Sequence, residues 1–157
     1  MSYSLPDTGI SKVMGLLEIL HDRGDSEETV RLVSALKLSI EDLLPVTEAA
    51  EMLGFVSISG GRIALSEIGL KIVNGDIQSR KSILKDRLVE LESFKKATSL
   101  LADKKNRRMP KRAFLKLFKA ELSPEDANKT VKKIIEWGRH AGIIGYESDS
   151  DQIYLVS

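Results

Sequence analysis

The segment from Ser39 to Leu70 changes its pattern of apolar positions from a helical period to strict alternation. Up to Gly54, apolar or small residues recur at three- and four-residue spacing, which predicts a helix with one buried face. These positions are Ile40, Leu43, Leu44, Thr47, Ala50 and Leu53. Beyond Gly54, apolar and polar residues alternate on both sides of Gly60-Gly61, which predicts a β-hairpin. A third helix that leads into a two-stranded hairpin is typical of a winged helix, a variety of helix-turn-helix.

Residues that begin or interrupt helices predict the helices before and within this segment. Residues 11–22 predict a first helix, and Ser26 with Glu27-Glu28 predicts the start of a second, short one. In the third helix, Pro45 removes an internal hydrogen bond. We therefore expect the regular helix to begin at Asp42, which places Pro45 in the tolerant first turn.

The second half of the chain shows the same order of patterns. Residues 77–105 predict a single long helix, which would bridge two domains or form the seam of a dimer. Its apolar positions step by nearly 3.5 residues, as in helices that pack lengthwise: Leu84, Leu88, Leu91, Phe94, Thr98 and Leu101. Residues 106–109 predict a basic loop, two further helices follow, and Trp137 is expected at the edge of the buried face of the last one.

The predicted fold class is mainly α with small β-hairpins (α+β), arranged as tandem winged-helix domains joined by a long helix. The predicted domains are residues 1–75 and residues 76–157. Their third helices are expected at residues 43–53 and 125–140, and their hairpins at residues 56–65 and 144–155.

Charge is distributed unevenly, although the formal net charge is only +1. Residues 1–76 hold 6 basic and 12 acidic side chains, a net of −6. Residues 77–140 hold 18 basic and 8 acidic side chains, a net of +10, and residues 141–157 have a net of −3. Such asymmetry indicates separate tasks for the two halves, or an acidic surface that meets a basic one.

Two sets of charged residues are candidate binding surfaces. The first is an acidic partner surface on the third helix, which carries no Lys or Arg: Glu41, Asp42, Glu48 and Glu51. A phosphate backbone would repel this helix. The second is a candidate site for a polyanion or an acidic partner, the alternative being a solvated lysine-rich surface: Arg107, Arg108, Lys111, Arg112, Lys129, Lys132 and Lys133.

The sequence offers little for catalysis or metal binding. It has no cysteine, its two histidines (His21 and His140) are far apart in sequence, and no GxxxxGK[ST] motif is present to bind phosphate. We therefore expect no enzyme activity, no catalytic residues, no cofactor and no metal.

The N-terminus lacks the features of a signal peptide, and no apolar run approaches the ~20 residues that span a bilayer, so we expect a cytoplasmic protein.

Five segments carry a resemblance to a known family: Gly15–Gly24, Asp42–Val46, Glu48–Phe55, Asp76–Lys81 and Glu136–Ala141. Together they resemble the C-terminal AAA-associated domain, which follows the nucleotide-binding domain in ATPase subunits of nitrate-, sulfonate- and taurine-type ATP-binding-cassette importers. The resemblance extends over essentially the whole chain, and because no GxxxxGK[ST] motif is present, we expect the module to stand alone here, without an ATPase. It implies a non-catalytic, regulatory accessory module and supplies no catalytic residues.

The function expected from the sequence is protein–protein contact by a non-enzymatic accessory module. The expected partner is a protein, with a transporter ATPase subunit as the candidate, and a homodimer through the 77–105 helix is a further expectation. The alternative is a DNA-binding transcriptional regulator that uses the basic C-terminal half.

Overall fold

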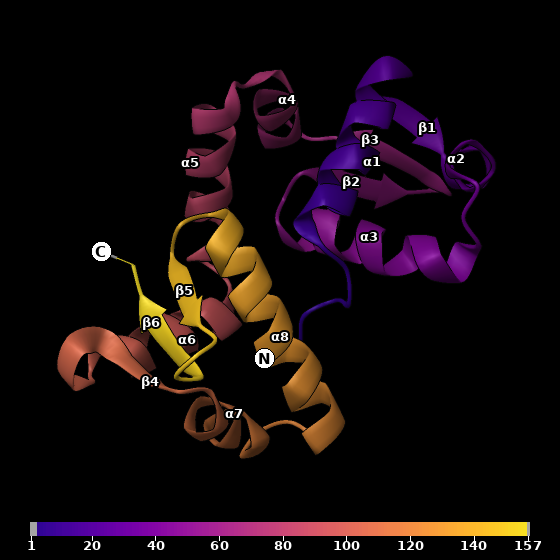
Figure 1. The fold of residues 1–157 in the computed structure, drawn as a ribbon. Coiled ribbons are helices and arrows are strands. Elements are labelled where there is room, and N and C mark those ends of the chain that lie inside the picture. The colour runs from indigo at the N-terminus through magenta and orange to yellow at the C-terminus, as the bar shows by residue number, and fades with distance from the viewer. Residues whose placement is uncertain (1–2, 157) are drawn as a thin grey trace. The chain divides into compact units, whose positions relative to one another are not determined.

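The structure is a computed structural model that describes residues 3–156, and it divides the chain into two compact units (Figure 1). The N-terminal unit comprises residues 8–84. The C-terminal unit comprises residues 85–156 together with residues 3–7. Helices dominate, and each unit has one small antiparallel sheet of three strands. The predicted class, mainly α with small β-hairpins, is confirmed.

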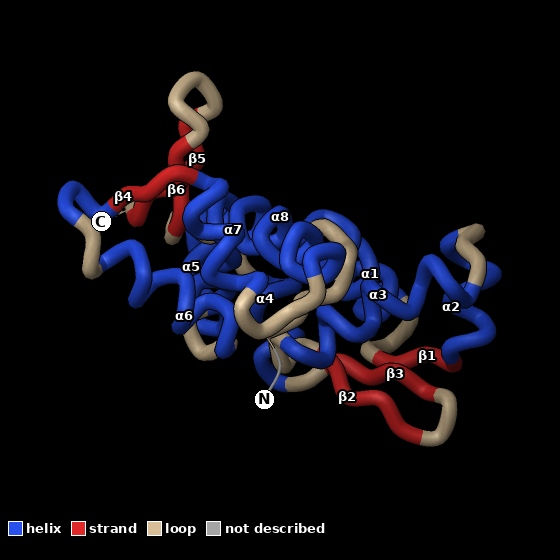
Figure 2. The backbone as a smooth tube through the Cα atoms, turned by 90° about the horizontal axis from the view of Figure 1, so that it is seen from below, coloured by secondary structure: helices blue, strands red, loops and turns tan. Residues whose placement is uncertain are grey.

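The N-terminal unit has the order helix, strand, helix, helix, strand, strand, followed by two more helices. Its elements are α1 (Ile10–Asp22), β1 (Ser26–Glu28), α2 (Thr29–Leu36), α3 (Ile40–Met52), β2 (Val56–Ser59), β3 (Arg62–Leu65), α4 (Glu67–Asn74) and the start of α5 (Ile77–Leu88). The strands lie in the order β1-β3-β2 (Figure 2). The hairpin predicted over residues 56–65 is confirmed.

The core of the N-terminal unit lies between its helices and one face of its sheet. Ile63 of β3 pairs with Ile58 of β2 on one side and Glu27 of β1 on the other. Because side chains alternate along a strand, Ile63 and Leu65 point to the same face of the sheet. Large side chains on α1, on α2 and around the end of α3 complete this core and are fully buried: Leu17, Leu20, Leu32, Leu53 and Phe55.

The C-terminal unit repeats the same order of elements. They are α6 (Glu92–Ala102), the 3₁₀ turn η1 (Lys105–Arg107), β4 (Arg108–Pro110), α7 (Lys111–Lys119), α8 (Pro124–His140), β5 (Ile144–Glu147) and β6 (Gln152–Leu155). The strands lie in the order β4-β6-β5 (Figure 2), which matches the first sheet. The hairpin predicted over residues 144–155 is also confirmed.

The first described residues pack onto the C-terminal unit. The main-chain N–H of Leu5 donates to Thr130 Oγ1 of α8 at 3.3 Å. Asp7 forms an ion pair with Lys133 Nζ at 3.4 Å, and Tyr3 packs edge-on against Phe118 of α7. Residues 3–7 therefore belong to a unit whose other residues begin about 80 positions later, and Leu5 is buried in its core.

The single long helix predicted over residues 77–105 is wrong. Two helices replace it, α5 and α6, and residues 89–91 separate them. Leu84 and Leu88 are buried in the single chain, so they are not exposed along a helix for a partner copy to contact. The prediction of a homodimer depends on that continuous helix, and without its exposed apolar seam we expect a monomer instead.

Three shorter segments also differ from expectation. Ser26–Glu28 forms β1 rather than the start of a helix, and Arg108–Pro110 forms β4 where a loop was expected. Both are three-residue strands that exist because β3 and β6 supply a pairing edge. The third helix begins at Ile40 rather than Asp42, with Ser39 as its cap, so Pro45 lies inside the helix.

Candidate interaction surfaces

The exposed side of α3 combines carboxylates with aliphatic side chains. All four residues of the acidic set, Glu41, Asp42, Glu48 and Glu51, are exposed on this one helix. Ile40, Leu44 and Met52 are exposed beside them, by 49, 50 and 38% respectively. The surface is therefore acidic and apolar at once.

Local contacts explain how α3 keeps this orientation in spite of Pro45. The Ser39 hydroxyl oxygen accepts a hydrogen bond from Asp42 N at 3.1 Å, which caps the first turn. Glu41 and Asp42 lie in that turn, where the helix dipole favours negative charge. Pro45 has no N–H to donate to Glu41 O of the preceding turn. Separately, the Thr47 hydroxyl donates to Leu44 O at 2.9 Å. Buried Leu43, Val46 and Ala50 fix the opposite side of the helix in the core.

The seven basic candidates are all in the C-terminal unit, but they do not form one exposed surface. Lys133 is buried on α8, where it forms ion pairs with Asp7 and with Glu136 at 3.2 Å. Lys129 forms an exposed ion pair with Glu125 at 3.3 Å.

The basic residues around β4 interact with the second hairpin. Arg108 is 3.7 Å from Glu147 and lies over the ring of Tyr154, and Lys111 lies over the ring of Tyr146. Of the seven candidates, Arg107, Arg112 and Lys132 are exposed and have no ion pair or ring contact among residues 3–156. They lie on three different elements: η1, α7 and α8.

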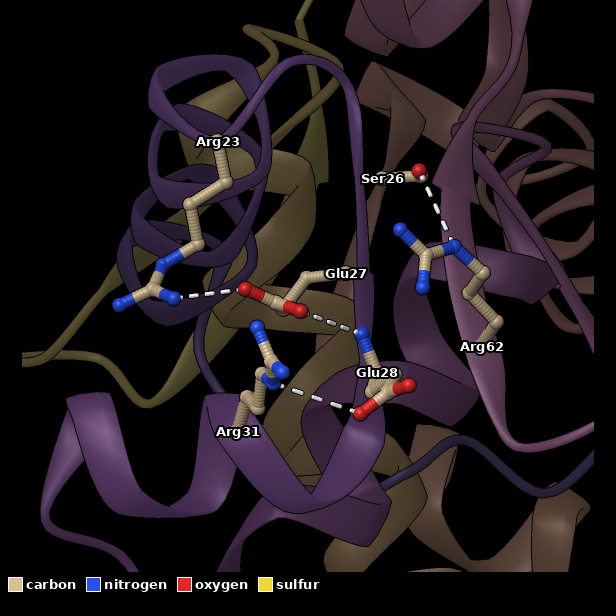
Figure 3. Close-up of polar contacts among 6 residues, drawn as sticks. All are labelled: Arg23, Ser26, Glu27, Glu28, Arg31 and Arg62. Atoms are coloured by element: carbon tan, nitrogen blue, oxygen red, sulfur yellow. Dashed lines mark hydrogen bonds and ion pairs between the residues drawn. The ribbon is translucent and has the colours of Figure 1, made fainter.

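A polar network at β1, which sequence reasoning missed, is shown in Figure 3. The Arg23 guanidinium donates to Glu27 Oε2 at 2.6 Å, and Glu27 Oε1 accepts from the main-chain N–H of Glu28 at 2.8 Å. These two hydrogen bonds, the one from Arg23 first, hold the pKa of Glu27 below its ordinary value. Arg31 lies 3.4 Å from Glu28, and Arg62 Nε donates to Ser26 Oγ at 3.3 Å.

This network has a structural role, because it ties the edge strand to its neighbours. Glu27 is only 7% exposed, and both of its oxygens are hydrogen-bonded. The four-residue spacing of Arg23 and Glu27 did not predict their ion pair, because the two residues do not share a helix.

One of the segments that carry the family resemblance, Asp76–Lys81, forms the junction between α4 and α5. Asp76 Oδ1 accepts from Ser79 N at 2.8 Å, and this hydrogen bond lowers the pKa of Asp76. Arg80 donates to the main-chain oxygens of Val73 at 2.7 Å and Gly75 at 3.1 Å. Arg80 thereby holds the end of α4 against the start of α5.

In the second hairpin, the Tyr146 hydroxyl donates to Asp151. This hydrogen bond raises the pKa of Tyr146, because the neutral phenol is the donor. The acidic turn is held by a second bond, from the Ser150 hydroxyl to Glu147 at 2.6 Å.

Neither a metal-binding cluster nor a membrane-spanning helix is found among residues 3–156. Residues 3–156 contain no group of three His, Cys, Asp or Glu side chains arranged to hold a metal ion. Within the same residues, no helix combines the length and apolar content needed to cross a bilayer.

The chain matches a known protein family. Residues 30–147 match the C-terminal AAA-associated domain family. The matched range begins in α2 and ends with β5, so it includes α3, α8 and both sheets in large part. No curated protein and no solved structure matched the chain.

Proposed function

Because the chain belongs to the C-terminal AAA-associated domain family, and so is an accessory module linked to ATP-binding-cassette ATPases, we propose that it regulates such an ATPase subunit by direct contact. Each unit, in this proposal, is a winged helix that serves as a binding scaffold rather than as an enzyme. The element order helix, strand, helix, helix, strand, strand, present in both units, supports this interpretation.

The observation that carries the proposal is the exposed side of α3. In a winged helix this is the helix that usually enters the DNA major groove. Here it presents Glu41, Asp42, Glu48 and Glu51, together with exposed Leu44, and it has no basic residue. Carboxylates at this position repel phosphates and attract a basic protein surface.

The test uses purified ATPase subunits of nitrate-, sulfonate- and taurine-type importers from the same organism. We expect one of them to bind the full chain in calorimetry and to change its rate of ATP hydrolysis when the chain is added. The triple variant Glu41→Lys/Glu48→Lys/Glu51→Lys should weaken binding at least tenfold.

The matched control replaces three exposed acids of the C-terminal unit, Glu90→Lys/Asp103→Lys/Asp149→Lys, and should bind as the unmodified chain does. Equal affinity of both triple variants would contradict the role of α3. Failure of every importer ATPase subunit to bind would reject the proposed partner.

A second candidate function is DNA binding through the C-terminal unit, which the exposed Arg107, Arg112 and Lys132 favour. A merely basic surface binds DNA with a Kd of ~10⁻⁴–10⁻⁶ M and without sequence preference at physiological salt. We expect this weak result in fluorescence anisotropy. Selection of one sequence motif from genomic fragments, lost in Arg112→Glu/Lys132→Glu, would show instead that the chain is a DNA-binding regulator.

A further inference from the structure

A small apolar groove lies between α3 and the β2–β3 hairpin of the N-terminal unit, with a volume of about 140 Å³. Its floor is formed by Leu43 and Ile63, each 1% exposed. Ile40, Leu44 and Ile58 form its rim and are all exposed by more than a third. The groove therefore presents an apolar surface to solvent that the unit itself leaves uncovered.

The local structure explains why these side chains remain exposed. Ile40 and Leu44 are four residues apart, so they lie on the same side of α3. Ile58 shares its sheet face with Ile63 but lies one residue from the end of β2, where the hairpin extends past the core. Since burying a Leu or Ile side chain removes apolar surface from water, covering these side chains would contribute favourably to binding.

Acidic side chains lie beside the groove. Glu41 and Glu48 are exposed on α3, three residues before and four residues after Leu44. A groove of about 140 Å³ lined by aliphatic side chains suits one large apolar side chain. The chemistry that fits is one apolar anchor with positive charges on either side of it.

We propose that this groove binds a basic amphipathic helix of a protein partner, with one leucine-like side chain in the groove and Lys or Arg residues facing Glu41 and Glu48. This proposal rests on the proposed function, because it specifies the part of the partner that α3 contacts. The mode is that of a helix in an apolar groove, where spaced anchors provide affinity and flanking charges provide orientation.

A second copy of the chain fits the groove poorly. Its α7 is basic and exposes Leu117 by 38%, but Phe114 and Phe118 of that helix are fully buried, so α7 offers one partly covered anchor without a second large apolar side chain beside it. Nucleic acid is disfavoured by the same carboxylates that would attract a basic helix. A heterologous protein helix is the occupant that matches both the apolar rim and the acids.

The probe is a set of three synthetic helical peptides of equal length. The first has leucines at i, i+3, i+4 and i+7 and lysines flanking them. The second replaces each lysine by glutamate, and the third replaces each leucine by alanine. We expect the full chain to bind the first peptide with a micromolar Kd and the other two at least tenfold more weakly.

The chain's own variants locate the binding. Leu44→Ala should weaken binding of the first peptide at least tenfold, and NMR methyl shifts should cluster at Ile40, Leu44 and Ile58. Leu44 is half exposed, so its truncation should leave the fold intact. Met52→Ala, on the same helix but outside the groove lining, is the matched control and should change Kd less than twofold.

Several results would overturn the proposal. They are unchanged affinity in Leu44→Ala, shifts confined to other residues, equal binding of the alanine peptide, or concentration-dependent dimers that compete with the peptide. If an importer ATPase subunit binds the chain but Leu44→Ala leaves that affinity unchanged, the groove proposal fails and the proposed function stands. If no ATPase subunit binds while the leucine peptide still depends on Leu44, the groove proposal stands and the proposed partner fails.

Discussion

Replacing Gly69 by alanine is expected to destabilise the N-terminal unit, although alanine favours helix more than glycine does. Gly69 is buried in the first turn of α4. A β-carbon at this position would overlap the main-chain oxygen of Phe55. That oxygen is held in place, because it accepts a hydrogen bond from Ser66 N at 2.9 Å. The Gly69 N–H donates to Ser66 Oγ at 3.0 Å, and the Ser66 hydroxyl donates to Gly54 O at 2.5 Å. These hydrogen bonds tie the start of α4 to the Gly54-Phe55 segment, so neither can shift to make room for a methyl group.

The magnitude follows from three contributions. Inserting a methyl group into a packed site typically costs about 1–3 kcal/mol. Displacing the Phe55 oxygen weakens a hydrogen bond worth about 0.5–1.5 kcal/mol, whereas the higher helix propensity of alanine returns up to about 1 kcal/mol. We therefore expect Gly69→Ala to lower the free energy of unfolding by about 0.5–3.5 kcal/mol.

Gly15→Ala is the matched control in the same unit. Gly15 lies within α1, and a β-carbon there would have no atom within 4 Å. Only the propensity gain remains, so this variant should be more stable by about 0.5–1 kcal/mol.

Urea unfolding measures both variants. Far-UV circular dichroism follows the helices of both units, and the fluorescence of Trp137, the chain's single tryptophan, follows α8 of the C-terminal unit. Using both probes shows whether one transition or two must be fitted. A Gly69→Ala variant that unfolds at the same urea concentration as Gly15→Ala, or higher, would refute the steric argument.

Three further predictions concern stability and assembly. Leu17→Ala and Leu53→Ala, both at fully buried positions, should each lower the free energy of unfolding by about 2–5 kcal/mol; a loss below half a kcal/mol would mean that neither site is in the core. The pKa of Glu27 lies below its ordinary value of 4.5, so the stability that its carboxylate contributes is present above pH 4.5 and is lost as the pH falls through the lowered pKa. Glu27→Gln should therefore flatten the acid branch of a plot of unfolding free energy against pH, and an unchanged slope would count against the Arg23 contact. Because Leu84 and Leu88 are buried, light scattering in moderate salt should give the mass of one chain, whereas a stable dimer would require another contact surface.

Both hairpins could be predicted from the sequence, and helix faces in part, because each depends on a local period. Ile40 and Leu44, predicted on the buried face of the third helix, are exposed instead, and Trp137, expected at the edge of a buried face, is fully buried. Val56 and Ile58 alternate before a glycine turn, and α8 begins at a serine cap followed by Pro124. The two short strands β1 and β4 have no such signal. Ser26–Glu28 has the composition of a helix start, and it becomes a strand because β3 offers an unpaired edge. Pairing between distant segments overrides weak local propensity here.

The break between α5 and α6 also lacks a local signal. Residues 89–91 include no proline or glycine, and the apolar period continues through them.

Among the candidate site residues, the burial of Lys133 could not be predicted from the sequence either, because its ion-pair partner Asp7 lies at the other end of the chain. The exposure of Glu41, Asp42, Glu48 and Glu51 followed from helical spacing alone, and the structure agrees with it. The apolar groove beside these acids could not be predicted from the sequence, because it forms only where the β2–β3 hairpin packs against α3.

The opposite charges of α3 and α8 bear on how a basic partner would approach. The two helices occupy the same position in the order of elements, yet the exposed side of α3 carries carboxylates and no base. Beyond its acidic first turn, where Glu125 pairs with Lys129, α8 exposes Lys132 and Arg139. A basic helix is attracted by α3 and repelled by the basic part of α8, so charge directs such a partner to the N-terminal unit. At physiological ionic strength, screening limits such forces to about 8 Å, so charge orients the partner only during the final approach. The apolar contact at Leu44 must then supply most of the affinity. Raising the salt concentration should therefore slow association with the leucine peptide while changing its dissociation rate little.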